Sequence, residues 1–518
     1  MSKIFHKEQL AKAVNPKFAE MVFKDSKIKP KFSENALTIL RKRYLQSGET
    51  PEGMLERVSM GNPDWYNMMA RLDFLPNSPT LFNLGTGKGT SSACFVFDIE
   101  DSMDHIMHVA TKIASVQKWG GGVGMNFSKL RPKGAEVKGT GNHAGGPVAF
   151  LKMYNAIGDC ITQSGKRNAA QMAILNVYHA DIEEWITCKQ EDPDSLSTFN
   201  MSVEIPDQFM NLVTKGKGNS SDRDIETFNK ITEAAWKTGD PGVYFVDRAE
   251  RDNPTPHLGP LVGPNPCGEV PNRDNEPCNL GSINLLNMIM IKHDGSKGLN
   301  LKKLDETVRL AVRYLNAVLD NNQFSHPDIT KAAYETRKIG LGVMGWADAL
   351  ATMNIHYDTN EAVGLGKLIM NIIQKTAHDE SEKMCEEITE EEGMYPSWQE
   401  PAPKRRNATV TCIAPTGTIS ILANCLEGST LVHTVEWGKQ KIQSLVNKNY
   451  SVYCVDESGK PTIKRAFDTK MTQKKAPVYK VQFDTGVFLR AILLNIQNQR
   501  HNRLNQFGYL QWAGIYRV

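Results

Sequence analysis

The sequence predicts a central α/β domain, preceded by a helical region and followed by an all-β segment. Up to about residue 75, apolar residues recur at the spacing of an amphipathic helix. From 76 to 424, short apolar runs alternate with longer amphipathic segments, as in domains with mostly parallel strands. From 425 to 518, strand-like runs are separated by turn residues, which is typical of antiparallel sheets. We therefore expect three regions, 1–75, 76–424 and 425–518.

The helical prediction for the first region depends on the segment SENALTILRKRYL. In a helix, its Leu37, Leu40 and Tyr44 would lie on one face, with Ser33 as the N-cap. The first residues of the chain lack the apolar core of a signal peptide. No apolar run approaches the roughly 18 residues of a membrane span. We therefore expect a cytoplasmic protein without a membrane partner.

The second region contains the alternation that predicts the α/β domain. Its expected strands lie at 92–99, 174–178, 199–205 and 243–246. The helix after the first strand opens at Asp101–Ser102, and its apolar stripe comprises Met103, Ile106, Met107, Ala110, Ile113 and Ala114. A helix over 304–319 places a second apolar set on one face: Leu304, Val308, Ala311, Val312, Leu315 and Val318.

Charge and cysteine content narrow the function classes. The chain has 61 basic and 58 acidic residues, a balance that gives no indication of a nucleic-acid partner. From Cys425 onward the balance shifts to 14 basic against 6 acidic residues, which marks a boundary there. Nine cysteines without tight spacing argue against a secreted disulfide scaffold. The chain also lacks the paired C-x-x-C motifs that would predict a zinc site. We predict no metal site and expect any disulfide to be catalytic.

Two glycine-rich segments have different interpretations. The run from Trp119 to Gly124 has four glycines in its last five residues, which costs backbone entropy and requires a structural reason. A tight turn and the close approach of the backbone to a ligand are the two explanations. The segment Gly340-Leu-Gly342-Val-Met-Gly345 matches a dinucleotide-binding fingerprint, but the preceding KAAYETRK is not a buried strand. We therefore assign its glycines to close packing.

A cysteine on a Pro/Gly-rich loop is the first candidate for chemistry. In Asn265-Pro-Cys267-Gly-Glu269, a thiol lies between an amide and a carboxylate. In an extended loop, alternate side chains point the same way, which would bring together a hydrogen-bond donor, a sulfur and a general base. A single cysteine is more often an inert buried residue, but the polar loop favours a reactive Cys267. Eleven residues further on, Cys278 lies in a strand-like segment.

The turn from Pro415 to Thr418 follows an apolar run and leads into a helix-like segment. Free backbone N–H groups and hydroxyls at a helix start can bind an anion such as phosphate. A simple capped helix explains the same pattern equally well.

Together these segments resemble the large subunits of ribonucleotide reductases. The matching motifs occur in the family's order over roughly residues 30 to 424: NSPTLFNLGTG with SSACFV, KWGGGVGMNFSKLRP, NPCGE followed by EPCNLGSINL, RKIGLGVMGWAD, and RNATVTCIAPTGTIS. The resemblance implies a ribonucleotide-reductase-type α/β barrel of two parallel half-sheets around a finger loop. In this chain that barrel is expected to be incomplete.

The resemblance also assigns roles to the candidate residues. Cys267 matches the cysteine that becomes a thiyl radical and removes the 3′-hydrogen of a ribonucleotide. Cys94 and Cys278 match the pair that reduces the 2′ position and ends as a disulfide, which requires their Cα atoms to lie within about 7 Å. Glu269 matches the residue that takes the 3′-hydroxyl proton, and Asn265 matches the amide that orients the hydroxyls.

Substrate and effector sites follow from the same resemblance. The implied substrate is a ribonucleoside di- or triphosphate, and the residues expected to hold it are Ser78, Gly121, Gly122, Thr416, Gly417 and Thr418. Asp101 and Arg131 are assigned to a site for dNTP or ATP effectors, which usually lies at a dimer interface. A loop containing Gln163, Lys166 and Arg167 would relay the effector's identity to base choice, although Asn168 stands where the family often has a second arginine.

The resemblance further implies a cofactor and partners. The residues of these motifs most resemble those of the adenosylcobalamin-dependent branch of the family, so adenosylcobalamin is the expected cofactor. A thioredoxin- or glutaredoxin-like reductant would regenerate the thiols, and the complete enzyme would be a homodimer.

The resemblance breaks at Cys425. The sequence Cys-Leu-Glu-Gly-Ser-Thr resembles the beginning of an intein, in which Cys425 would convert the peptide bond after Asn424 to a thioester. The later Thr-x-x-His element, the closing Asn and the downstream nucleophile are absent, so the chain is not expected to splice itself. The last barrel strands and the family's C-terminal reducing cysteines are absent too, so the chain alone is expected to be inactive.

Two other functions compete with the reductase. A glycyl-radical-type enzyme has a related barrel, but it would have a glycine-radical loop near its C-terminus and no use for the Cys94/Cys278 pair. A non-catalytic remnant would bind nucleotides without turnover.

Overall fold

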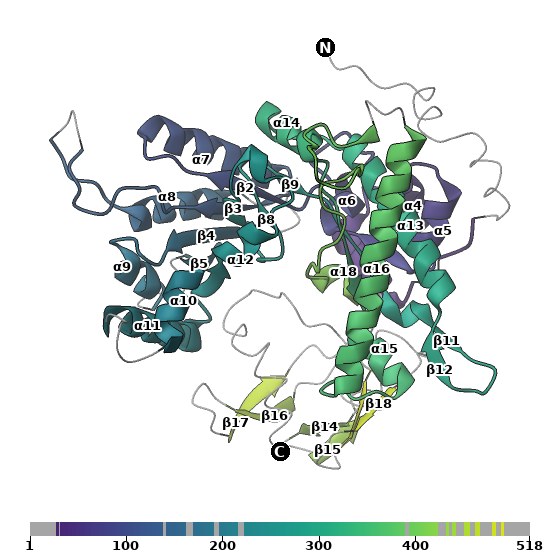
Figure 1. Cartoon of the computed structure of the whole chain (residues 1–518). Coiled ribbons are helices and arrows are strands. Elements are labelled where there is room, and N and C mark those ends of the chain that lie inside the picture. The colour runs from purple at the N-terminus through teal and green to yellow at the C-terminus, as the bar shows by residue number, and fades with distance from the viewer. Residues whose placement is uncertain are drawn as a thin grey trace.

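The computed structural model describes residues 27–30, 32–137, 141–161, 169–190, 196–215, 222–388 and 393–422, together with six short strands between 431 and 491. Figure 1 shows a sheet-containing part that includes helix α7 (Met103–Lys118), and a helical part around α13 (Leu301–Asp320) and α16 (Asn360–Glu387). Each part has its own apolar core. None of the described helices has the length and apolar composition needed to cross a membrane.

The N-terminal region is helical, as predicted. Helix α3 (Glu34–Ile39) continues as the π-helical turn η1 (Leu40–Tyr44), and α4 (Pro51–Val58) and α5 (Pro63–Ala70) follow. The hydroxyl of Ser33 accepts a hydrogen bond from the Ala36 backbone N–H at 3.1 Å, which confirms the predicted N-cap. Of the predicted stripe, Leu40 and Tyr44 are buried and Leu37 is partly buried.

The larger sheet has six strands in the order β6-β5-β4-β3-β2-β9. Its strands are β2 (Cys94–Asp98), β3 (Gly122–Asn126), β4 (Gln171–Asn176), β5 (Phe199–Ile205), β6 (Gly242–Phe245) and β9 (Pro277–Cys278). The first five run parallel, whereas β9 runs antiparallel to β2. The expected alternation of strands and helices is confirmed, with strand ends shifted by a few residues.

Among the described residues, six helices accompany the larger sheet. They are α7, α8 (Pro147–Cys160), α9 (Ile182–Thr187), α10 (Asp207–Lys215), α11 (Asp222–Thr238) and α12 (Val246–Arg251). Ser102 caps α7, as its position predicts. The predicted apolar stripe of α7 is partly wrong, because Met103 and Met107 are 61% and 49% exposed. The buried face of α7 instead includes Val109 and Val116, so it is rotated around the helix axis relative to the predicted stripe.

A second sheet has three strands in the order β1-β10-β13. Strand β1 (Phe74–Pro76) runs antiparallel to β10 (Leu280–Asn284), which runs parallel to β13 (Gly340–Met344). Helix α13 packs its apolar face into the core beside this sheet. Its predicted buried residues are all 0% exposed: Leu304, Val308, Ala311, Val312, Leu315 and Val318.

The expected barrel is not closed in the described residues. Only Asn279 separates β9 of the larger sheet from β10 of the smaller one. The smaller sheet has one parallel strand pair, and beyond β13 it continues only as an isolated bridge between Leu341 and Thr411. A closed barrel requires every strand to have a neighbour on both sides. In the described residues, the larger and the smaller sheet each end in unpaired edge strands, so they do not form a ring.

Short elements connect these layers. They are α6 (Ser78–Asn83), η2 (Pro256–Leu258), β7 (Gly263–Pro264), β8 (Pro271–Asn272), η3 (Leu285–Met288), β11 (Ile289–Ile291), β12 (Lys297–Leu299), α14 (Pro327–Thr336), α15 (Trp346–Met353) and α18 (Gly417–Ile421). The packing role predicted for Gly340 and Gly342 is confirmed, because a Cβ on either residue would overlap Cys412.

The described strands after residue 430 are antiparallel, as the pattern predicts. Four of them form a sheet in the order β15-β14-β16-β17, and β18 pairs with β19. Their bounds are β14 (Leu431–Thr434), β15 (Gly438–Lys441), β16 (Tyr450–Val455), β17 (Pro461–Ala466), β18 (Tyr479–Gln482) and β19 (Phe488–Ala491).

Candidate active site

Cys94 and Cys278 lie directly opposite each other in the larger sheet. Cys94 on β2 is the register partner of Cys278 on β9, and the backbone N–H of Ala93 donates to the Cys278 carbonyl at 3.2 Å. Opposed residues of an antiparallel pair have Cα atoms about 4.5 to 5.5 Å apart, which is within the range of a disulfide. Both cysteines are buried and reduced. The strand register therefore brings together two thiols that are 184 positions apart in the sequence.

The surroundings of Cys278 favour its protonated thiol. Burial raises the pKa of Cys278 well above its ordinary value, and the hydrogen bond with Cys94 and the charge of Glu269 act in the same direction. A protonated thiol can deliver both a proton and an electron. A thiolate formed before substrate binds would instead react with any electrophile.

The loop that carries Cys267 is the tip of a short hairpin. Strands β7 and β8 pair in antiparallel fashion, with residues 265–270 between them. The side-chain oxygen of Asn265 accepts from the Val270 N–H at 3.0 Å, and the Gly268 N–H donates to the Asn265 carbonyl at 2.9 Å. Gly268 has φ +84°, which only glycine adopts without strain. The sequence NPCGE therefore forms a defined turn.

This turn changes one expectation from the sequence. Asn265 is completely buried, Cys267 is exposed, and Glu269 is partly buried. The three side chains do not follow the alternation of an extended loop, because the turn closed by Gly268 reverses the chain between them. The exposure of Cys267 also differs from the water-free position that a radical-bearing cysteine requires.

The amide of Asn265 has an unused donor. Its oxygen is occupied by Val270, but its Nδ2 is buried without a hydrogen-bond partner in the part of the chain that the structure describes. A buried polar group without a partner costs free energy, roughly 1 to 3 kcal/mol. Such a donor is available to a hydroxyl of a bound ligand.

Gly122 and Gly124 of the glycine-rich run leave space for this hairpin. A Cβ on Gly122 would lie 2.9 Å from Pro266 Cγ, and a Cβ on Gly124 would overlap the Pro264 carbonyl oxygen. Asn200 on β5 donates to the Pro266 carbonyl at 2.6 Å. The close approach that the glycines allow is therefore with the hairpin. Gly121 faces Phe95 in the same way, and contact of Gly121 and Gly122 with a substrate stays a prediction.

A third thiol that the sequence analysis missed lies beside the pair. The Sγ of Cys412 donates to the main-chain oxygen of Glu269 at 3.6 Å, and Cys412 packs against the small cluster containing Cys94, Cys278 and Leu280. Burial raises the pKa of Cys412, and the Glu269 carboxylate adds to this effect. The run ATVTCIA contained this cysteine, but its apolar neighbours indicated only a strand.

A buried ion-pair cluster fixes the strand that carries Cys278. Glu276 is fully buried and pairs with Lys338 at 2.6 Å and with Arg273 at 3.1 Å, and the Thr336 hydroxyl donates to it at 3.2 Å. Burial alone would raise the pKa of Glu276, but Lys338 and Arg273 together hold it below its ordinary value. The cluster links β9 to the end of α14.

The segments predicted to hold phosphate are brought together by two consecutive residues. The Tyr44 hydroxyl hydrogen-bonds the Ser78 hydroxyl at 2.9 Å, and Arg43 Nη1 donates to Thr418 Oγ1 at 3.2 Å. Ser78 begins α6, and Thr416 occupies the N-cap position of α18, which begins at Gly417. Arg43 and Tyr44 were missed as site residues; the basic run RKRY was the available signal.

Of the predicted effector residues, two lie in the described part of the chain. Arg131 Nε pairs with Asp101 Oδ2 at 2.8 Å, and the Arg131 guanidinium also donates to the Glu136 carbonyl at 3.2 Å. Gln163, Lys166 and Arg167 lie outside the described residues, as does Cys425.

Comparison with known proteins shows the family to which the chain belongs. A family model described as "Ribonucleotide reductase, barrel domain" matches residues 92–229 and 221–405, and one described as "Ribonucleotide reductase, all-alpha domain" matches residues 30–89. The chain belongs to the ribonucleotide reductase large-subunit family. This membership also accounts for the helical region in front of the sheets.

Ribonucleotide reductases of known name align with much of this family member. A vitamin B12-dependent ribonucleoside-diphosphate reductase of Mycobacterium tuberculosis (strain CDC 1551 / Oshkosh) is 40% identical over 435 residues, covering 77% of this chain and 62% of its own length. One of Thermoplasma acidophilum is 43% identical over 374 residues, covering 69% and 48%. The chain therefore spans about half to three fifths of the length of these relatives.

A solved structure supports the fold. The alpha subunit of the Actinobacillus ureae class Id ribonucleotide reductase superposes with a TM-score of 0.65, covering 81% of this chain and 80% of that one, at 22% identity. At this identity the likeness establishes the ribonucleotide reductase fold of the chain.

Proposed function

We propose that the chain contributes the catalytic site for reduction of ribonucleotides to 2′-deoxyribonucleotides. The observation that carries this proposal is the opposed pair Cys94 and Cys278, buried next to the Glu269 carboxylate and the hairpin of Cys267. The names of the relatives, which are ribonucleoside-diphosphate reductases, support the same reaction. A glycyl-radical enzyme would have no use for the thiol pair.

The proposed roles follow from chemistry and position. Cys267 removes the 3′-hydrogen of the ribose, the free Nδ2 of Asn265 donates to a ribose hydroxyl, and Glu269 accepts the 3′-hydroxyl proton. The 2′-hydroxyl leaves as water. Cys94 and Cys278 supply two electrons and two protons as their S–H bonds break and an S–S bond forms. Cys267 regains its hydrogen at the end, so the radical is not consumed.

The substrate is a ribonucleoside di- or triphosphate. Its phosphates would lie where Arg43 meets Thr418 and Tyr44 meets Ser78, because a guanidinium and hydroxyls together bind phosphate oxygens. Gly121, Gly122, Thr416 and Gly417 complete the proposed contacts.

Adenosylcobalamin is the proposed cofactor. The names of the vitamin B12-dependent relatives support it, and the exposure of Cys267 at the hairpin tip leaves its sulfur within reach of a bound cofactor. When bound, the cofactor supplies the radical. No residue of the chain is assigned as its ligand.

Regulation and partners belong to the proposal as well. Asp101 and Arg131, with Gln163, Lys166 and Arg167, would bind dNTP or ATP effectors. The exposed Met103 and Met107 of α7 lie directly after Asp101 and suit burial against a second copy in a homodimer. A thioredoxin- or glutaredoxin-like protein in the cytoplasm would reduce the disulfide formed in each turnover.

The segment from Cys425 is proposed to be an incomplete intein. The Cys-Leu-x-Gly-x-Thr motif and the antiparallel strands that follow support this origin. We predict that the chain does not splice itself. Incubation of the purified chain with a thiol tests this, and cleavage between Asn424 and Cys425 would contradict it.

The function is tested by measuring nucleotide binding and reduction on the full chain. The prereduced chain receives adenosylcobalamin, cytidine diphosphate and dithiothreitol, and deoxycytidine diphosphate is quantified. Product that is absent in Cys267→Ser but unchanged in Cys160→Ser, which removes an exposed thiol elsewhere, supports the proposal. Binding without product would agree with the expected inactivity of the chain alone and also with the non-catalytic remnant, and failure to bind nucleotide would contradict both.

A further inference from the structure

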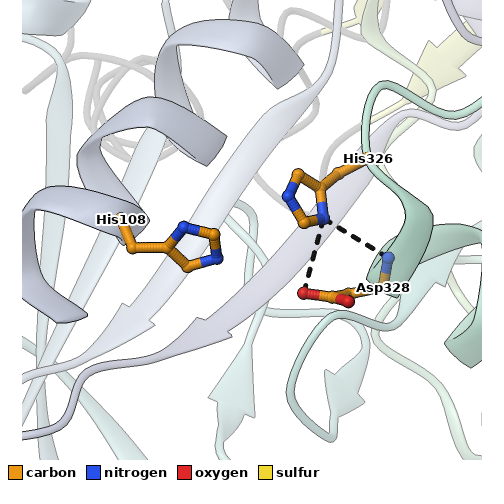
Figure 2. A group of neighbouring side chains, drawn as sticks. All are labelled: His108, His326 and Asp328. Atoms are coloured by element: carbon orange, nitrogen blue, oxygen red, sulfur yellow. Dashed lines mark hydrogen bonds and ion pairs between the residues drawn. The ribbon is translucent and has the colours of Figure 1, made fainter.

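Three potential metal ligands from two helices converge on one space. His108 lies on α7, and His326 and Asp328 lie at the start of α14. Figure 2 shows the His108 and His326 rings facing each other, with the Nδ1 of His326 directed toward Asp328. One ligand atom from each residue lies within 4.8 Å of the other two. Among the described residues, no other group of three His, Cys, Asp or Glu side chains brings its ligand atoms this close together.

Ordinary structural roles explain only part of this arrangement. His326 is the N-cap of α14, and its Nδ1 accepts from the Asp328 backbone N–H at 3.3 Å. Asp328 forms an ion pair with Lys112 at 3.0 Å. Neither role requires His108, whose exposed ring lies edge-on to His326 with 5.4 Å between the ring centroids. An N-cap needs only a small acceptor such as Ser or Asn, so an imidazole facing another imidazole calls for a different reason.

We propose that His108, His326 and Asp328 bind a divalent transition-metal ion of the Zn²⁺ type. Two imidazoles and one carboxylate are a ligand set that suits Zn²⁺, Ni²⁺ and Co²⁺, with the remaining positions left to water. His108 and Asp328 are exposed, so an ion can enter from solvent. The bound ion would link α7, which packs against the larger sheet, to α14.

The distances are compatible with a site that tightens on binding. Bonds of about 2.1 Å in a tetrahedral site place ligand atoms about 3.4 Å apart. His326 Nδ1 and Asp328 Oδ2 are already 3.4 Å apart. The exposed His108 can rotate to close the remaining distance. Metal binding at Nδ1 replaces the cap hydrogen bond from Asp328.

Lys112 is the charge that opposes a bound cation. Its ammonium group is buried and donates to Asn275 Oδ1 at 2.9 Å and to Asp328 Oδ2 at 3.0 Å. A carboxylate has two oxygens and about four acceptor positions, so Asp328 can bind an ion and still accept from Lys112. The nearby positive charge weakens the site, so removing it strengthens metal binding.

The test is titration of the full chain with Co²⁺ at about pH 7.5, followed by visible absorption and competed with Zn²⁺. Cobalt bound through nitrogen and oxygen lacks the intense near-ultraviolet bands of cobalt thiolates, which separates this site from the cysteines. His108→Ala, His326→Asn and Asp328→Asn should each weaken binding at least tenfold. Asn keeps a cap for α14 in the His326 variant, so loss of binding there does not reflect loss of the helix.

Two further variants distinguish a metal site from a structural cluster. His105→Ala is the matched control, because His105 lies on the same helix but its Nδ1 accepts from the Glu100 backbone N–H at 3.1 Å; its binding should equal that of the wild type. Lys112→Met keeps the apolar stem and removes the charge, and should bind Co²⁺ severalfold more tightly. Equal Co²⁺ binding by the wild type and His108→Ala, or no binding outside the cysteines, would overturn the proposal.

Discussion

At the scale of single residues, burial decides how each thiol reacts. Cys278 and Cys412 have pKa values raised by burial, whereas Cys160 and Cys267 are exposed. Only the thiolate is a good nucleophile, so a raised pKa moves reactivity to higher pH. Cys278 is thereby less reactive toward oxidants at neutral pH than an exposed thiol.

Alkylation by iodoacetamide at about pH 8 should separate these classes. We expect Cys160 and Cys267 to react at least about tenfold faster than Cys278 and Cys412, because the pKa values of the buried Cys278 and the partly buried Cys412 are raised. Mass spectrometry of timed samples measures each rate, and unfolding in urea should equalise them. Rapid labelling of Cys278 in the folded chain would show that the site is open.

The charge of Glu276 should contribute strongly to the free energy of unfolding. Glu276→Gln leaves the buried Lys338 ammonium without its ion-pair partner, while Arg273 keeps its pair with Glu335 at 3.1 Å, so the free energy of unfolding should fall by about 3 to 5 kcal/mol. Urea unfolding measures this change. The control Glu233→Gln removes an exposed helical pair with Lys237 and should have no measurable effect.

The same carboxylate predicts the direction of the pH dependence. Because the pKa of Glu276 is lowered in the folded state, its stabilisation is fully present above about pH 4.3, the ordinary pKa of glutamate, and is lost as the pH falls below that value. The Gln variant should therefore lose less stability than the wild type between about pH 5 and pH 3. An equal loss in both proteins would contradict the assignment.

At the scale of elements, the hairpin of Cys267 depends on glycines of the neighbouring strand. Gly124→Ala on β3 should displace the hairpin, since the added Cβ overlaps the Pro264 carbonyl oxygen. We expect a loss of about 1 to 3 kcal/mol in unfolding free energy, the usual cost of overpacking. Gly364→Ala is the control, because it lies in α16 with open space around its Cβ position; it should stabilise by about 0.5 to 1 kcal/mol. Unchanged stability in Gly124→Ala would contradict this packing.

Helices and strands with strong periodic patterns could be predicted from the sequence. The buried face of α13 and the bounds of β5 follow directly from helical and alternating apolar patterns. The α7 stripe was partly wrong because Met103 and Met107 are apolar but face away from the core. Periodicity identifies an apolar face but does not say what covers it.

At the scale of the whole molecule, the site lies where the two sheets meet. Cys94 belongs to the larger sheet, while Leu280 of the smaller sheet and Cys412 join the same small cluster. The family motifs predicted Cys94, Cys278 and the hairpin residues. Cys412 and His108 could not be predicted, because each meets its partners only through contacts between distant segments, whereas Arg43 was missed although it lies in the basic run RKRY.

The open barrel explains the exposure of Cys267. The two sheets are joined through β9 and β10 but do not enclose the hairpin in the described residues. The relatives are longer than this chain, which spans about half to three fifths of their length. The pairing of β2 with β9 assembles the thiol pair within the described residues.

Disulfide mapping tests the central claim, that Cys94 and Cys278 form the redox pair. Exposed thiols of the folded, prereduced chain are first blocked with iodoacetamide at neutral pH, and the protected thiols are then oxidised with diamide at about pH 9. The strand register predicts a Cys94–Cys278 disulfide as the main product in peptide mass spectra. A main product joining Cys412 to either residue, or two thiols that stay unlinked, would contradict the account.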